Sequence, residues 1–233
     1  MNEINPLPLV DIHTHNFKPS GNITIVNVIL ADKSDNKNSI SPILLRNQKP
    51  FTYFSAGIHP WFSDDWETQI KLLEELSVHP KVIALGECGL DKSIKTSLDE
   101  QRKILNLQIK LSEKTQKPLI IHCIKAYNEL IEIRKSTKSD LPWIIHGFNS
   151  SLKVAENCIK YGIYLSFGRS LFNNSLKMTE LIQWIPISKL FLETDESDLP
   201  IEEIYLKYLK IKGISMNQLK VEMLQNFNTC FKF

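Results

Sequence analysis

The sequence lacks an excess of charge of either sign. Its 28 Lys and Arg residues nearly balance its 26 Asp and Glu residues, which leaves a formal net charge of +2. Domains that bind nucleic acid through their overall charge are clearly basic. If the substrate is DNA, the positive charge must therefore be local to the site or come from bound metal ions, which are often the largest charges in a site.

Long apolar runs and paired cysteines are also missing. No apolar segment approaches the length of a membrane span, and the first residues, MNEINPLPLVDIHTH, lack the basic region and apolar stretch of a secretory leader. The four cysteines, Cys88, Cys123, Cys158 and Cys230, show no CxxC spacing. We therefore expect no membrane association, a reducing cytoplasmic location, and cysteines that act as small buried hydrophobic side chains.

What the chain does contain is a regular alternation of short apolar segments with longer amphipathic ones. The apolar segments are rich in Val, Ile, Leu and Phe, as strands buried on both faces should be. The predicted strands are Leu9–His15, Ile23–Leu30, Tyr53–His59, Val82–Leu90, Leu119–Ile124, Trp143–Phe148, Ile163–Phe167 and Leu190–Thr194. The predicted helices are Asp64–Val78, Ser97–Gln116, Ala126–Lys135, Leu152–Tyr161, Leu176–Trp184, Ile201–Leu209 and Ser215–Phe231. This α/β alternation, with eight strands, predicts one (β/α)8 barrel domain over residues 1–233.

The connection after the first strand does not fit a regular barrel. Only about seven residues separate His15 from Ile23, whereas a parallel crossover usually takes roughly a dozen or more and contains a helix. We therefore expect the first helix of the barrel to be missing. The second strand is expected to be short, displaced or antiparallel, and the barrel irregular at this point.

Ionisable side chains gather at the carboxyl ends of the predicted strands. Five of the six histidines lie there, and only His79 does not. The residues concerned are Asp11, His13, His15, His59, Glu87, Asp91, His122, His146, Glu193, Asp195 and Glu196. Barrel enzymes build their sites at this face, and ionisable groups at the ends of apolar strands are costly unless they are paired or bind metal.

These side chains predict a metal site. Residues i and i+2 of a strand point to the same face, so His13 and His15 can reach one ion together. Four histidines, Glu87 and Asp195 are more ligands than one tetrahedral ion needs, and they suit two divalent ions that share a carboxylate. Nitrogen and oxygen ligands without thiolate fit magnesium, manganese, cobalt or zinc. Asp195 is also the candidate general base that takes a proton from the attacking water.

Other residues near the strand ends are candidates for substrate binding. His59 lies in a Gly-Ile-His-Pro-Trp turn and can donate to a phosphate oxygen, while Trp61 can stack on a base. Lys92, Lys125 and Arg169 follow strands and are candidate phosphate contacts. Cys88 and Cys123 follow proposed ligands, so strand alternation turns them away from the site.

The motifs DIHTH, GIHPW, GECGLD, IIHC, HGF and ETD occur in this order from Leu9 onwards, and together they resemble the TatD family of metal-dependent hydrolases. The resemblance implies a distorted TIM barrel with 3′–5′ exonuclease or related deoxyribonuclease activity on DNA, through single strands or 3′ ends, often with magnesium. It also implies one ion bound by His13, His15, Glu87 and Asp195, and a second ion that Glu87 shares with His122 and His146. Asp195 would then be the base, and His59 would contact phosphate.

Several motifs depart from the family pattern. The usual GxHPH is GIHPW here, HxR is replaced by HCIK, and HCFSG or HCFTG by HGFNSS. All six expected ligands are present, so hydrolysis is expected, whereas the changes fall where substrate would be gripped. Compact chains of this kind also resemble TatD-like components of bacterial antiphage gene cassettes, which would imply protein partners and another substrate.

Three other functions remain as alternatives. Amidohydrolase-type barrels also open with HxH and end with an aspartate, but they commonly bridge their metals with a carboxylated lysine where Glu87 stands here. PHP-type phosphoesterases would carry more histidines and acids. A barrel that binds metal without turnover, as a subunit of an assembly, would be expected to have lost a ligand.

Overall fold

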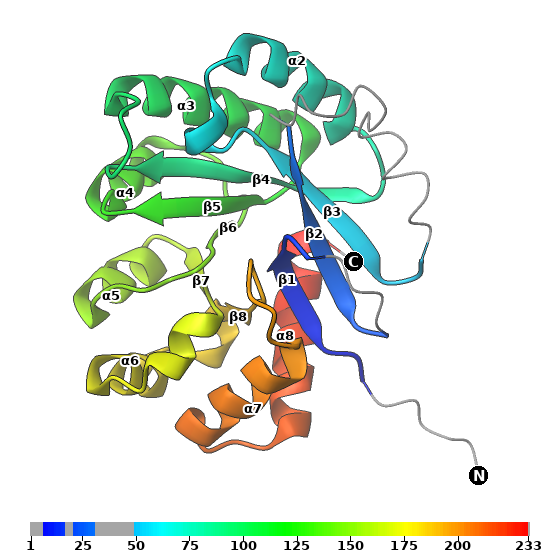
Figure 1. The fold of residues 1–233 in the computed structure, drawn as a ribbon, viewed down its shortest axis with the longest axis vertical. Coiled ribbons are helices and arrows are strands. Elements are labelled where there is room, and N and C mark those ends of the chain that lie inside the picture. The colour runs from blue at the N-terminus through cyan, green and yellow to red at the C-terminus, as the bar shows by residue number, and fades with distance from the viewer. Residues whose placement is uncertain (1–6, 17–20, 31–48, 233) are drawn as a thin grey trace.

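The computed structural model describes residues 7–16, 21–30 and 49–232, which form a barrel of parallel strands surrounded by helices (Figure 1). The strand order is β1-β2-β3-β4-β5-β6-β7-β8, and every neighbouring pair is parallel. The strands are β1 (Val10–Thr14), β2 (Ile23–Ile29), β3 (Thr52–Gly57), β4 (Val82–Asp91), β5 (Leu119–Ile124), β6 (Trp143–Ile145), β7 (Ile163–Phe167) and β8 (Leu190–Leu192). The predicted barrel of eight strands is confirmed.

The barrel closes between its first and last strands. Thr14 pairs with Asp195 in a parallel bridge. The amide of Asp195 donates to the carbonyl of His13 at 2.9 Å, and the amide of His15 donates to the carbonyl of Asp195 at 3.1 Å. The residues that close the barrel are therefore themselves predicted metal ligands.

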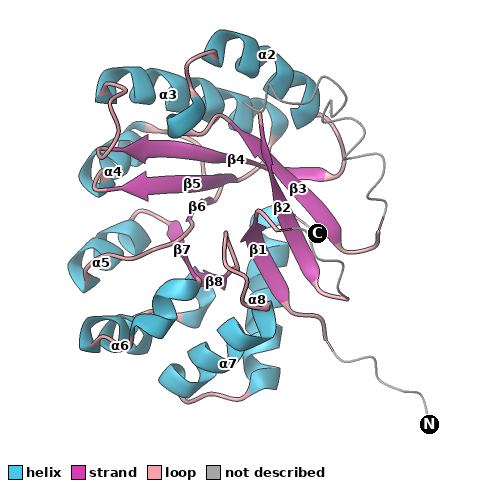
Figure 2. Cartoon of the chain, in the orientation of Figure 1, coloured by secondary structure: helices cyan, strands magenta, loops and turns pink. Residues whose placement is uncertain are grey.

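Helices cover the outside of the barrel, as Figure 2 shows by colour. They are α2 (Trp66–Ser77), α3 (Leu98–Thr115), α4 (Tyr127–Ser136), α5 (Leu152–Lys160), α6 (Leu176–Trp184), α7 (Ile201–Lys212) and α8 (Met216–Phe231), with short 3-10 turns at Pro60–Phe62, Arg169–Asn173 and Ile187–Lys189. Each overlaps the helix predicted for its segment. Every residue of β1, β4 and β7 is buried, because these strands face side chains of the barrel on one side and helices on the other.

The prediction that β2 would be short, displaced or antiparallel was wrong. β2 is seven residues long and runs parallel to β1, with Val10 paired to Ile23. Because Ile23 pairs with Val10, the chain has to run back along only four residues of β1, from Thr14 to Val10, or roughly 13 Å at ~3.3 Å per residue. The eight residues 15–22 span ~27 Å when extended, which is enough for this return. A helix is therefore unnecessary, and residues 15–16 and 21–22 are not helical, whereas 17–20 lie outside the described residues. The expected irregularity is seen as a register shift between Asp11 and Thr14.

The four cysteines are free thiols buried in the core, as the sequence predicts. Cys88 and Cys123 line neither of the hollows beside the predicted ligands, and burial raises the pKa of both thiols above its ordinary value. None of the helices in the described part of the chain is long and apolar enough to cross a membrane.

Candidate metal centre

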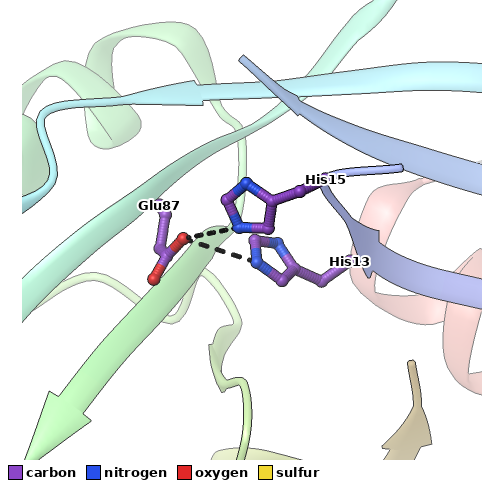
Figure 3. A group of neighbouring side chains, drawn as sticks. All are labelled: His13, His15 and Glu87. Atoms are coloured by element: carbon purple, nitrogen blue, oxygen red, sulfur yellow. Dashed lines mark ion pairs between the residues drawn. The ribbon is translucent and has the colours of Figure 1, made fainter. Parts of the chain in front are cut away.

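Glu87 lies at the centre of a histidine cluster at the carboxyl end of the barrel. His13 and His15 from the end of β1 both point at it (Figure 3). The Nε2 atom of each ring lies 3.4 Å from Glu87 Oε2. The two rings meet at this oxygen because His13 and His15 occupy alternate positions at a strand end, and their role as metal ligands stays a prediction.

The other oxygen of Glu87 faces a different group of histidines. Glu87 Oε1 lies 2.8 Å from His146 Nε2, 3.0 Å from His122 Nδ1 and 3.0 Å from His59 Nε2. One carboxylate thus presents one oxygen to the histidines at the end of β1 and the other to His122 of β5 and to the histidines that follow β3 and β6. This division is what a carboxylate shared by two cations requires.

The backbone around Glu87 allows this approach. Gly89 has φ +151°, and a Cβ atom there would lie 1.9 Å from the carbonyl oxygen of His122. Any side chain would therefore separate β4 from β5 and move Glu87 away from His122. Asn27 of β2 also holds Glu87, since its Oδ1 accepts the amide of Glu87 at 3.0 Å and a hydrogen bond from Ser55 at 3.2 Å. Asn27 carried no sequence signal beyond its place in a strand.

Asp195 follows β8 and completes the side of the cluster that contains β1. Its Oδ1 lies 3.5 Å from His13 Nε2 and 3.6 Å from His15 Nε2. Asp195 has φ +54°, a left-handed conformation that aspartate tolerates better than most residues. Its side chain is 36% exposed, so one face of it remains open to a bound water or substrate.

The donor set fits metal binding. His13 is fully buried, yet its Nε2 atom has no hydrogen-bond partner among the described residues. Two ligand atoms held about 2.1 Å from one ion at a tetrahedral angle lie roughly 3.4 Å apart. The spacings of 3.4–3.6 Å around His13 and His15 match that value and exceed a good hydrogen bond. Three groups of side chains in the described residues have ligand geometry: His13, His15 and Glu87; His13, His146 and Asp195; and His59, Glu87 and His122.

Hydrogen bonds distinguish His122 from His59 within the third group. His122 lies between two carboxylates, with Nε2 3.1 Å from Asp91 Oδ2 and Nδ1 3.0 Å from Glu87 Oε1. With a cation bound at Glu87, the ring proton would lie on Nε2 and the lone pair of Nδ1 would face the cation. In His59 the pattern is reversed, because its Nδ1 accepts the backbone amide of Trp61 at 3.1 Å. The neutral ring of His59 therefore carries its proton on Nε2, as a hydrogen-bond donor does and a metal ligand does not.

The charges of the cluster support one another. Burial by itself raises the pKa of Glu87, but the histidines that face it hold the pKa of this carboxyl well below its usual range. Burial lowers and the contacts to Asp195 and Glu87 raise the pKa of His13, and the contacts dominate. The pKa of His146 falls below its ordinary value because burial prevails there. Glu87 and Asp195 are therefore ionised, whereas His13 has to release a proton before it can bind a cation.

Two hollows adjoin the cluster and meet at Asp195. One has apolar walls from Ile29, Trp61 and Phe62 beside Glu87 and the histidines. The other is a polar groove that includes Asn149, Arg169, Ser170 and Asn173. The cluster therefore lies between a surface with aromatic side chains and a groove lined by the positively charged side chain of Arg169.

The predicted substrate contacts are placed differently from one another. Trp61 lines the apolar hollow with its side chain 54% exposed, and Arg169 is exposed in the polar groove. Lys125 is exposed after β5 but lines neither of these hollows. Lys92 forms a close ion pair with Glu129, so its positive charge is already neutralised by a carboxylate.

Sequence reasoning left two buried acids at strand ends without a role. Asp91 contacts His122 and also accepts the indole N–H of Trp61. Glu193 is fully buried, accepts the amide of Gly147 and lies 3.9 Å from His146 Nδ1. Burial and the nearby charge of Asp195 raise the pKa of Glu193 to about 8. Their places in the GECGLD and ETD motifs were the available signal.

Known proteins share both the sequence and the fold. The family model for TatD related DNase matches residues 10–232. An uncharacterized metal-dependent hydrolase, YabD, from Bacillus subtilis is 33% identical over 191 residues, which cover 77% of this chain and 75% of that protein. The 3′–5′ ssDNA/RNA exonuclease TatD of Escherichia coli K12 is 28% identical over 175 residues, or 73% of this chain and 67% of that one. The human 3′–5′ RNA nuclease TATDN2 is 35% identical over 146 residues, 60% of this chain but 19% of its own length.

Solved structures agree on the fold. The E. coli TatD homologue YJJV superposes with a TM-score of 0.77 at 21% identity and covers 90% of this chain and 86% of its own. An uncharacterized amidohydrolase from Saccharomyces cerevisiae reaches 0.72 at 14% identity, with 89% of this chain and 88% of its own covered, so the barrel alone does not separate these classes. The family model, which matches residues 10–232, separates them: this protein belongs to the TatD family of metal-dependent hydrolases.

Proposed function

We propose that this protein is a two-metal phosphodiesterase that removes nucleotides from the 3′ end of single-stranded nucleic acid, with DNA as its main substrate. The observation that carries the proposal is the division of Glu87, whose Oε2 faces His13 and His15 while Oε1 faces His122 and His146. Two divalent ions held by these residues would activate a water and stabilise the attacking and leaving oxygens of an in-line displacement. Magnesium, manganese or zinc suits these ligands.

The residues of the chain have distinct tasks in this reaction. The attacking water forms a bond to phosphorus as its proton passes to a carboxylate oxygen of Asp195. The P–O3′ bond breaks, and the 3′ oxygen of the shortened strand takes a proton from solvent. His59 Nε2, whose proton is fixed by the hydrogen bond at Nδ1, donates to a non-bridging phosphate oxygen.

The two hollows suit a single strand. A terminal base can stack in the apolar hollow against Trp61, with Phe62 and Ile29 beside it. The rest of the strand can leave through the polar groove past Arg169. The proteins at about 30% identity with nuclease names act on single-stranded DNA and RNA or on RNA, which supports a nucleic-acid substrate and makes RNA the competing one.

The proposal is tested with end-labelled single-stranded DNA and RNA of the same sequence, each with magnesium, manganese or zinc. We expect stepwise shortening from the 3′ end, faster on DNA, and none with the double variant His122→Ala, Asp195→Ala. Faster cleavage of RNA would reassign the substrate. If every metal binds and neither polymer is cut, nuclease activity of this chain alone is wrong, and the centre needs another substrate or a protein partner such as a defence assembly would supply.

Arg169 provides a test of the strand path. Replacing Arg169 with Ala should raise KM by about tenfold and weaken the salt dependence of binding by roughly one phosphate contact, with kcat little changed. The measurement is KM at several salt concentrations. Lys110→Ala, which removes an exposed cation from α3, is the matched control. Equal effects of the two variants would show that Arg169 acts only through overall charge.

A further inference from the structure

Asp91, the last residue of β4, has all the hydrogen bonds that its carboxylate needs. Its Oδ1 accepts both the amide and the hydroxyl of Ser93, and its Oδ2 accepts the indole N–H of Trp61 at 2.6 Å. The same Oδ2 lies 3.1 Å from His122 Nε2. Both oxygens of Asp91 therefore face hydrogen-bond donors or a ring nitrogen, as suits a carboxylate acceptor. The backbone of Asp91 is also held in place, because the side-chain amide of Gln101 accepts its N–H and donates to its C=O.

A carboxylate with its four acceptor positions occupied has little freedom to rotate. His122 therefore faces an acceptor at a fixed position. Rotation of its ring about χ2, or movement of the proton from Nε2 to Nδ1, would break that hydrogen bond. The result is that Nδ1, whose distance from Glu87 Oε1 is 3.0 Å, keeps its lone pair directed at the place of the cation. An acceptor of this kind behind a histidine ligand raises metal affinity.

Trp61 thus takes part in two contacts with two different parts of its ring. The side chain lines the apolar hollow and is 54% exposed, which leaves ring surface that can stack on a base. The indole N–H, by contrast, points down to Asp91, and the ring centroids of Trp61 and His122 lie 5.7 Å apart. An aromatic residue that served only for stacking would not need this donor, since phenylalanine also stacks.

We propose that Trp61 and Asp91 are positioning residues for His122, joined as a relay from the indole N–H through the Asp91 carboxylate to His122 Nε2, and that Trp61 thereby supports ion binding apart from any contact with substrate. This inference rests on the metal centre of the proposed function but not on the identity of its substrate.

The two contacts of Trp61 can be separated by substitution. The imidazole of histidine overlays the five-membered ring of tryptophan, with Nε2 in the place of Nε1, so Trp61→His keeps a donor for Asp91 and removes the surface that stacks. Trp61→Phe keeps a stacking ring and removes the donor. Asp91→Asn removes the charge of the central acceptor without changing its size. Phe62→Leu is the control, since Phe62 lines the same hollow and has no contact with Asp91 among the hydrogen bonds of the described residues.

The first measurement is zinc affinity by competition with a chelating dye. We expect Asp91→Asn to lower the affinity for the more weakly bound of the two ions by about 10–100-fold, and Trp61→Phe to lower it by about tenfold. Trp61→His and Phe62→Leu should bind zinc with close to the wild-type affinity. Circular dichroism checks that each variant is folded, and if Asp91→Asn is not, the Phe and His variants of Trp61 decide the matter. Equal zinc affinity of Trp61→Phe and the wild type, or equal losses in Trp61→Phe and Trp61→His, would overturn the relay.

The second measurement needs neither turnover nor metal. Long-range ¹H–¹⁵N spectra of the metal-free protein, at alkaline pH where the ring is neutral, should show His122 protonated at Nε2 only. Asp91→Asn and Trp61→Phe should give a mixture of tautomers. Failure of the wild type to cut nucleic acid would remove the proposed function and leave this result standing, whereas a wild-type His122 protonated at Nδ1 would refute the relay even in an active nuclease.

Discussion

Replacing Glu87 with Gln will lower nuclease activity by about a thousandfold or more and remove both ions from the protein. The amide keeps the size of the side chain but has no charge, and only one of its two terminal atoms is an oxygen. It can face His13 and His15 or face His122 and His146, but it cannot offer a ligand to both groups. Paired ions supply several kcal/mol of transition-state stabilisation, and each ~1.4 kcal/mol is worth about tenfold in rate.

The measurements for this variant are kcat/KM on single-stranded DNA and the metal content of the purified protein. Glu75→Gln, an exposed glutamate of α2 changed in the same way, is the control and should behave as the wild type. A Glu87→Gln protein that binds two ions and keeps a tenth of the wild-type activity would contradict the shared carboxylate.

Replacing Asp195 with Asn should lower kcat by about 10²–10⁴-fold while most of the bound metal remains. Asp195 Oδ1 lies 3.5–3.6 Å from the Nε2 atoms of His13 and His15, so it has one contact toward a cation. Its side chain is 36% exposed and the second oxygen, Oδ2, forms none of these contacts, so Oδ2 is the oxygen free to take a proton, which an amide cannot do at neutral pH. The loss should therefore appear in kcat and not in KM.

A titration with metal separates the two roles of Asp195. If Asp195 is only a ligand, excess metal will restore the activity of Asp195→Asn. If it is also the base, activity will stay low when both sites are filled. Glu196→Gln tests the neighbouring carboxylate, which lines both hollows but has no contact with the histidines among the ion pairs of the described residues, and should change kcat by less than about threefold.

Much of the site could be predicted because it depends on local pattern. Strands of a parallel barrel are buried on both faces, so their apolar runs are visible in the sequence, and polar residues at their ends are conspicuous. His13 and His15 share a face because of the twofold repeat of a strand, which needs no tertiary information. The predicted ends were less accurate at β6, which stops at Ile145 because Gly147 turns the chain with φ +56°.

The connection between β1 and β2 shows where local reasoning fails. Typical βαβ units predict a long crossover here, whereas the distance that the chain has to cover depends on where β2 pairs with β1. Pairing of Ile23 with Val10 leaves only a short return, which a few extended residues cover. Register of this kind is a property of two segments together and cannot be read from either one.

The sequence by itself determined the barrel and the histidines and acids at its rim, because strand periodicity and the burial of apolar runs act over a few neighbouring residues. Tertiary structure alone decided which oxygen of Glu87 faces which histidines, that the charge of Lys92 is taken by Glu129, and that Asp91 connects Trp61 to His122. Those contacts join residues 30 or more positions apart, as in the pairs Trp61–Asp91, His122–Asp91 and Lys92–Glu129. They depend on the register and closure of the strands, where a shift of one residue turns a side chain to the opposite face.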